Sequence, residues 1–294
     1  MYEVILKRGD VESSFTRLAE KFFSFLVSTS LFLAINGALK LYFSFALFNE
    51  KYVPSLLFAT FFIIFGVYGI NKLTDLKEDL INTPERANLI IRIQKVFKLL
   101  VILSFAISLI LGLTVNVLTI PVLLAPLFAG ILYSIRISPN LPRLKDITAV
   151  KNIIIALSWG IGAAFLPAIC YSKELITILL IFYFFTLRSF INSVLFDVRD
   201  VEGDKKSNIP TIPVTIGVEN TKKLLLALNS TFLPWLAIAY YLNLFTSHIL
   251  VVLLFAVIYS FAYILHFCNS KKIGKSLDLF VDGEWIILVA LLLM

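Results

Sequence analysis

The sequence predicts an all-α integral membrane protein with nine transmembrane helices. Of its 294 residues, 59% are apolar and 15% are charged, whereas soluble proteins average about 45–50% apolar and about 25% charged residues. The apolar residues are also gathered into long runs, and a membrane-spanning helix needs about 20 such residues. The nine runs cover residues 22–48, 53–70, 97–115, 118–135, 150–171, 174–196, 224–243, 247–268 and 279–294.

The basic residues predict how these segments are oriented. Of the Lys and Arg residues, 22 lie in or beside the N-terminal stretch and the loops that follow segments two, four, six and eight, while the opposite loops hold only Lys51 and Lys173. Cytoplasmic loops carry an excess of Lys and Arg. We therefore expect a multi-pass protein of the cytoplasmic membrane, with its N-terminus inside the cell and its C-terminus outside. This topology explains the net charge of +7 without a nucleic-acid partner.

Segments one and nine differ from the other seven. Segment one carries Asn36 and Lys40 within its apolar run, and because polar groups are costly in lipid we expect it to be tilted, bent or lining a cavity. Segment nine is short. No linker or low-complexity tract divides the chain, so residues 1–294 are expected to form a single membrane domain.

Two acidic stretches follow apolar segments. The first runs from Asn71 to Asp79 after segment two, and in a helix each four-residue step turns about 400°. Asn71, Asp75 and Asp79 would therefore share one face. The second stretch follows segment six and carries Asp197, Asp200 and Asp204. Both stretches are expected at the cytoplasmic face. They lie four segments apart, which suggests a repeat of helices 1–4 and 5–8 followed by helix 9.

The acidic stretches predict a shared magnesium site that opens to the cytoplasm. Several facing carboxylates repel one another unless a cation lies between them, and magnesium prefers oxygen ligands and often bridges carboxylates to substrate phosphates. The Cys and His residues are too scattered for zinc. The expected ligands are Asn71, Asp75, Asp79, Asp197, Asp200 and Asp204.

Basic side chains in the same loops are candidates for holding a diphosphate, because Lys and Arg form strong charge-assisted hydrogen bonds with phosphate oxygens. Lys151 begins an apolar segment, and Arg86 follows a turn after the first acidic stretch. The full set of candidates comprises Lys72, Arg86, Lys145, Lys151 and Arg199.

The paired motifs resemble the UbiA superfamily of intramembrane prenyltransferases. In that family an Asn-x-x-x-Asp-x-x-x-Asp stretch ends helix two and an Asp-x-x-x-Asp stretch ends helix six. Here the two motifs are Asn71/Asp75/Asp79 and Asp200/Asp204. The resemblance extends to Tyr133-Ser134, to Lys151-Asn152 and to residues 210–217.

The resemblance implies nine helices around a central cavity that opens sideways to lipid. It implies magnesium-dependent transfer of an isoprenyl group from an isoprenyl diphosphate to a hydrophobic acceptor, either a quinone precursor or a glycerol-phosphate lipid. Two magnesium ions would assist ionisation to an allylic carbocation, with Asp75, Asp79, Asp200 and Asp204 as catalytic residues. Aromatic faces can stabilise such a cation, and Tyr68 and Tyr133 are the candidates.

The sequence departs from the family pattern at two places. Lys72 stands where many relatives carry Asp, and segment one lacks the usual Arg-Pro pair. Asp278 and Asp282 share a helix face just before segment nine, and for them we expect solvation at the membrane interface rather than a third metal site.

Two other classes of membrane protein would show different sequence patterns. A transporter with a buried cation site is the alternative from another class, and it predicts charges near the bilayer midplane; here the acids cluster at one face. A CDP-alcohol phosphotransferase would show Asp-Gly followed by Ala-Arg. Asp282-Gly283 continues into Glu284-Trp285, which excludes that function.

Overall fold

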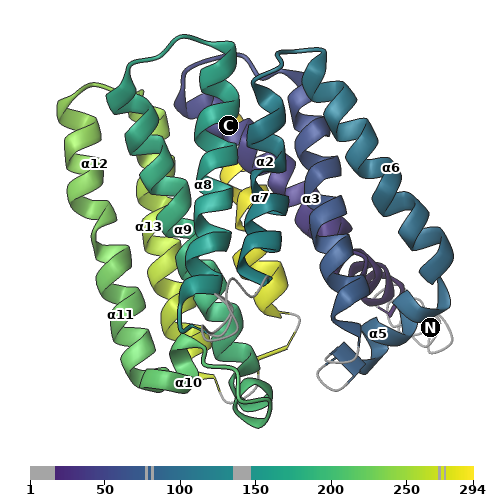
Figure 1. The fold of residues 1–294 in the computed structure, drawn as a ribbon. Coiled ribbons are helices and arrows are strands. Elements are labelled where there is room, and N and C mark those ends of the chain that lie inside the picture. The colour runs from purple at the N-terminus through teal and green to yellow at the C-terminus, as the bar shows by residue number, and fades with distance from the viewer. Residues whose placement is uncertain (1–16, 77–78, 81–82, 135–146, 271–272, 275) are drawn as a thin grey trace, which may run out of the picture.

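A computed structural model describes residues 17–76, 79–80, 83–134, 147–270, 273–274 and 276–294, with the backbone alone described for 131–134. All regular elements in these ranges are helices (Figure 1). Besides a helix at Arg17–Ser28, they are α2 (Leu31–Leu47), α3 (Pro54–Thr74), α5 (Pro84–Arg92), α6 (Gln94–Leu113), α7 (Thr119–Ser134), α8 (Val150–Cys170), α9 (Leu175–Lys206), α10 (Ile212–Ile216), α11 (Val218–Ser230), α12 (Phe232–Tyr241), α13 (Ser247–Asn269), η2 (Asp278–Asp282) and α14 (Glu284–Leu293).

The described helices confirm an all-helical protein with several membrane spans. By length and composition six of them can cross a membrane, or seven if one bent pair counts as a single span. Helices α6, α7, α8 and α13 match predicted segments three, four, five and eight within a few residues. The count of nine spans and the orientation in the membrane stay predictions.

Segment one is bent, as its polar residues led us to expect. The helix Arg17–Ser28 meets α2 at 74°, and Ser30 at the break has a left-handed backbone with φ 65°. The bend divides the predicted segment 22–48 between these two helices. Segment seven is continuous by comparison, because α11 and α12 meet at Thr231, whose backbone is helical, and together count as one candidate span.

Helix α9 explains how the second acidic stretch can be helical and yet reach water. Its 32 residues correspond to about 48 Å at 1.5 Å per residue, whereas the hydrocarbon core of a bilayer is about 30 Å thick. The last turns, with their acidic residues, therefore extend beyond the apolar layer. The short helices α5 and α10 lie at the same end of the bundle (Figure 1).

Segment nine begins with a π-helical turn. Gly283 N donates to the carbonyl oxygen of Asp278 over 3.1 Å, which closes a five-residue step. A Cβ atom at Gly283 would overlap the carbonyl oxygen of Leu279, so this geometry requires glycine. Single π-helical turns often occur at functional sites, and η2 places two carboxylates beside α2 and α9.

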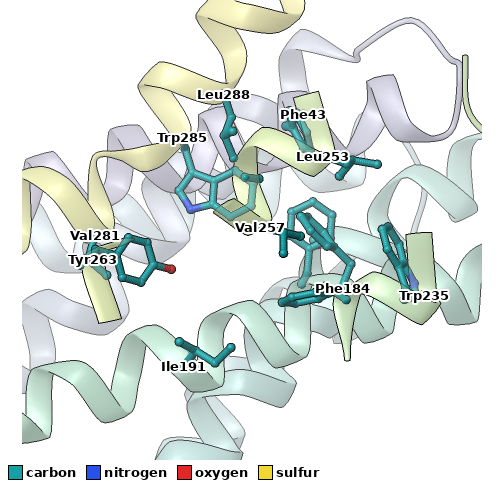
Figure 2. Close-up of a cluster of buried hydrophobic side chains, with 14 of the residues drawn as sticks. Phe43, Phe184, Ile191, Trp235, Leu253, Val257, Tyr263, Val281, Trp285 and Leu288 are labelled. Carbon is teal, nitrogen blue, oxygen red and sulfur yellow. The ribbon is translucent and has the colours of Figure 1, made fainter. Parts of the chain in front are cut away.

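Two buried apolar clusters hold the bundle together. One joins α9, α11, α12, α13 and α14, with Phe184, Trp235 and Trp285 among its largest members (Figure 2). The other joins α2, α3 and α6. Helices α8 and α9 pack closely because Gly160 faces Thr186. The outer face of α6 exposes large apolar side chains such as Leu99, Ile102 and Ile110, as a lipid-facing surface would.

Candidate active site

Two adjoining cavities lie between the clusters. The apolar cavity is lined mainly by aliphatic side chains of α2, α3, α7 and α8, including Ile63, Val67, Leu123 and Ile154. The polar cavity lies between α2, α9 and η2. Their volumes are about 200 and 320 Å³, far above the ~10–15 Å³ that one water molecule needs. Both can therefore admit a ligand.

The two cavities are adjacent, because several residues line both, and we refer to the pair as the chamber, with an apolar and a polar side. Lys40 and Tyr68 belong to the shared wall, together with Lys151 and Trp159. Gly37 also lies there, and a Cβ atom on it would overlap the Ile64 side chain. These residues therefore lie between a group held in one cavity and a group held in the other.

The first acidic stretch reaches the mouth of the chamber. Asn71 and Asp75 line the apolar cavity. Helix α3 ends at Thr74, whereas a shared face for Asn71, Asp75 and Asp79 requires a helix that continues to Asp79. The N–H groups of Asp75 and Asp79 nevertheless donate to the carbonyl oxygens four residues earlier over 2.9 Å. The predicted spacing is thus retained in the backbone. The carboxylate of Asp79 forms an ion pair with Arg86 of α5.

The second acidic stretch lies on the last turns of α9, across from the first. Asp197 and Asp200 line the polar cavity. Asp197 is buried and accepts hydrogen bonds from Lys151 over 3.2 Å and from Asn152 over 2.7 Å. Asp204 accepts one from the hydroxyl of Thr211 over 3.2 Å and is not among the residues that line either cavity.

Basic side chains lie around the same mouth. Lys72, Arg86, Lys151 and Arg199 all line the polar cavity. The guanidinium of Arg199 donates two hydrogen bonds to Asp200, over 2.8 and 3.0 Å. Lys72 donates to the carbonyl oxygen of Val27 over 3.1 Å. This ring of cations suits a diphosphate better than a neutral ligand.

The remaining predicted substrate residues divide into three cases. Tyr68 lines both cavities. Tyr133 lies in α7, where only the backbone is described. Lys145 lies outside the described residues.

Within the described residues, no three His, Cys, Asp or Glu side chains gather around a single point as a metal site. Instead the acids at the mouth form ion pairs with neighbouring cations. The donor set nevertheless fits magnesium, because it consists of carboxylate and amide oxygens. In addition, Arg86 Nε is buried without a hydrogen-bond partner among the described residues. This N–H group can therefore donate to an anionic ligand.

Asp278 and Asp282 do not lie where we expected. Both line the polar cavity, and Asp278 pairs with Arg199 over 3.4 Å. Solvation at the membrane interface is therefore wrong, because the π-helical turn directs this stretch toward α2 and α9. Burial raises the pKa of Asp278, and the guanidinium of Arg199 opposes that rise.

A buried polar network behind the polar cavity was missed by sequence reasoning. Arg188 and Glu284 are both fully enclosed and form an ion pair. Asn192 donates to Glu284 over 3.1 Å and accepts from the hydroxyl of Tyr263 over 2.8 Å. The sequence feature that points to this ion pair is the presence of opposite charges within two apolar segments, Arg188 in segment six and Glu284 in segment nine. A buried charge needs a partner.

Asn36 and Lys40 confirm the expectation that segment one lines a cavity. Both side chains contribute to the polar cavity, although only 2% of Asn36 and 6% of Lys40 is exposed. They lie four residues apart and hence on one face of α2.

The sequence matches the UbiA prenyltransferase family over residues 22–287. Two curated relatives are digeranylgeranylglyceryl phosphate synthases. The protein from Sulfolobus acidocaldarius is 28% identical over 163 residues, covering 53% of this chain and 54% of that protein. The protein from Methanosphaera stadtmanae is 28% identical over 130 residues, covering 44% and 47%. The chain thus aligns with about half the length of these relatives.

Solved structures share the fold. A UbiA homologue from Archaeoglobus fulgidus bound to GPP and Mg²⁺ superposes with a TM-score of 0.61 at 19% identity, covering 88% of this chain and 92% of that one. A digeranylgeranylglyceryl phosphate synthase structure gives a TM-score of 0.59 at 19% identity and covers 93% and 95%. At this level of identity the likeness establishes the arrangement of helices.

Proposed function

The chain belongs to the UbiA prenyltransferase family, and on that premise we propose that it transfers an isoprenyl group from an isoprenyl diphosphate to a hydrophobic acceptor inside the membrane. The observation that carries this proposal is the divided chamber. An isoprenyl diphosphate has a charged end and a hydrocarbon chain. The mouth offers charged side chains, and the apolar cavity continues from Asn71 and Asp75 into aliphatic surface.

The acidic stretches would hold two magnesium ions, with Asn71, Asp75 and Asp79 on one side and Asp197, Asp200 and Asp204 on the other. When bound, these ions neutralise the charge that develops on the leaving diphosphate. The ion pairs at the mouth suggest how the site is kept ready. Arg86, Lys151 and Arg199 each neutralise a carboxylate of the unloaded protein and would turn to phosphate oxygens when substrate binds.

The chamber also suits the reactive intermediate. An allylic carbocation reacts readily with water, so a chamber enclosed by apolar side chains protects it. Tyr68 lines both cavities, and its ring face can stabilise positive charge. Trp159 also lines both cavities, but its ring face already lies 3.8 Å from the ammonium group of Lys40, so we assign this role to Tyr68.

For the acceptor we favour a glycerol-phosphate lipid over a quinone precursor. Two curated relatives are named for a product that carries two geranylgeranyl groups on glyceryl phosphate. Lys72, which lines the polar cavity, would suit the phosphate of such an acceptor.

A transporter is disfavoured. Arg188 and Glu284, whose side chains are fully buried within the described bundle, form an ion pair with each other. They therefore leave no free cation site between them.

We further propose nine transmembrane helices in one domain, the N-terminus inside and the C-terminus outside, and a site that opens to the cytoplasm. This arrangement rests on the distribution of 22 basic residues against two. It places the diphosphate end of the chamber where soluble diphosphates and magnesium are available.

The deciding experiment is incubation of purified protein with labelled geranylgeranyl diphosphate, Mg²⁺ and a panel of acceptors, with products identified by mass. The panel should include geranylgeranylglyceryl phosphate and 4-hydroxybenzoate. A prenylated product with any member supports the proposal. Diphosphate binding without transfer to any acceptor would contradict it.

A further inference from the structure

The inner end of the polar cavity carries polar groups that lack partners. Asn36 is 2% exposed, and its Nδ2 donates to the carbonyl oxygen of Phe32 over 2.8 Å. Its Oδ1 accepts no hydrogen bond from the described residues. A buried acceptor without a partner is destabilising. Because Asn36 lines the cavity, a ligand with a donor group can supply the missing bond.

Lys40 lies one turn further along the same face of α2. Its ammonium group donates to the hydroxyl of Ser189 over 3.1 Å and lies 3.8 Å from the ring centre of Trp159 and 5.0 Å from that of Trp285. These described contacts are a hydroxyl and two rings rather than a carboxylate. An ammonium group has three donors, so Lys40 can also donate to a ligand oxygen.

Asp282 is the third member of this group. The other Asp residues that line the polar cavity all have cationic partners: Asp197 pairs with Lys151, while Asp200 and Asp278 share Arg199. Asp282 forms no ion pair or hydrogen bond with the residues that the structure describes, yet it faces the cavity. Its carboxylate is therefore available to accept a proton or a hydrogen bond from a ligand.

From these three residues we infer a head-group subsite for an acceptor that carries alcohol hydroxyls, with Asp282 as the group that accepts the proton of the attacking hydroxyl. The inference rests on the proposed prenyl transfer. The attacking hydroxyl can donate to the carboxylate of Asp282 and accept from Lys40, and a second donor on the head group, a hydroxyl or a protonated phosphate oxygen, can bond to Asn36 Oδ1. An aromatic carboxylate would place a negative charge beside Asp282.

The position of Asp282 suits the reaction. Helix η2 begins at Asp278, which touches Arg199 beside the second acidic stretch, and continues inward for one turn to Asp282. In the transfer step the acceptor oxygen forms a bond to C1 of the isoprenyl group. The bond between C1 and the diphosphate oxygen breaks, its electron pair leaves with the diphosphate, and the hydroxyl proton passes to Asp282.

The test compares Asp282→Asn with Glu174→Gln, which makes the same change of carboxylate to amide at an exposed residue just before α9, at the opposite end of that helix from the acidic stretch. Purified variants are assayed with geranylgeranyl diphosphate and geranylgeranylglyceryl phosphate. We expect Asp282→Asn to lower kcat by about 100-fold or more, as the loss of a general base does, with KM for the diphosphate within about twofold of wild type. Glu174→Gln should match wild type.

Asn36→Leu provides a second measurement that does not depend on the Asp282 variant being folded. We expect it to raise KM for the acceptor about tenfold, the effect of about 1.4 kcal/mol, while KM for the diphosphate stays unchanged. Wild-type kinetics in both variants, or an equal loss of affinity for both substrates, would overturn the subsite. The proposed function fails separately, if the wild-type protein transfers no prenyl group to any acceptor.

Discussion

The guanidinium of Arg188 and the carboxylate of Glu284 form an ion pair in which neither side chain is exposed. Three hydrogen bonds join them, the shortest being 2.6 Å. The pair connects α9, which carries the second acidic stretch, to α14, which follows the π-helical turn with Asp278 and Asp282. It therefore fixes one wall of the polar cavity relative to the other.

Removing one partner of this pair should be strongly destabilising. We expect Glu284→Ala to lower the free energy of unfolding by about 3–5 kcal/mol, because it leaves the buried charge of Arg188 without compensation. Unfolding of the detergent-solubilised protein measures the change. Lys173→Ala is the matched control, since the pair of Lys173 with Glu50 is partly exposed and should contribute less than about 1 kcal/mol. Equal effects of the two variants would contradict a structural role for the buried pair.

The acidic stretches should be required for transfer and not for folding. We expect Asp75→Asn and Asp200→Asn each to lower the rate of transfer by at least about 100-fold, because each removes charge that opposes the developing charge of the diphosphate. Product formation measures the loss, and an unchanged elution profile in size-exclusion chromatography shows that the fold remains. Near wild-type turnover in folded protein would refute the metal assignment.

Removal of divalent cations should stop transfer reversibly. With excess EDTA we expect no prenylated product, and added Mg²⁺ should restore the wild-type rate. Calcium should restore less, because it prefers more ligands at longer distances than magnesium does. Undiminished transfer in EDTA would rule out a metal requirement.

Arg86 should act on binding of the diphosphate. Arg86→Gln removes a guanidinium that lines the polar cavity, and a hydrogen bond to a charged group is worth about 1.5–3 kcal/mol. We therefore expect KM for the isoprenyl diphosphate to rise about 10- to 100-fold. Arg92→Gln, an exposed change on the same helix, should leave KM unchanged. If both variants shifted KM equally, the effect would be general electrostatics rather than a specific contact.

The orientation can be tested by labelling single cysteines. In a background in which Cys170 and Cys268 are replaced, we expect Glu202→Cys to react only with a reagent that has access to the cytoplasm. Asn243→Cys should react from outside the cell. Both positions are exposed at the ends of helices. Reversed accessibility would overturn the expected topology.

Regular local patterns allowed much of the fold to be predicted. Helices α6, α7, α8 and α13 were found from the lengths of their apolar runs, because a spanning helix must satisfy its own backbone in lipid. A bend in segment one was expected from Asn36 and Lys40, but its position at Ser30 and its angle of 74° were not. They depend on packing, which hydropathy does not report.

The same limit applies to the candidate site. Asn71, Asp75, Asp197 and Asp200 were found because acids at helical spacing stand out against apolar segments. The role proposed for Asp282 could not be inferred in this way, because it depends on a π-helical turn that directs a carboxylate toward α2. Pairing between residues that are distant in the sequence, such as Arg188 and Glu284, could likewise not be predicted from local sequence patterns.

The wall shared by the two cavities has a consequence for turnover. The isoprenyl diphosphate would contact both sides of the chamber and the acceptor mainly the polar side, whereas the product would hold both hydrocarbon chains in the chamber at once. The product is then held by the sum of two binding surfaces and must leave through the lipid. Release of the product into the bilayer, rather than bond formation, would then be the rate-limiting step. The turnover number would therefore depend on the fluidity of the surrounding lipid.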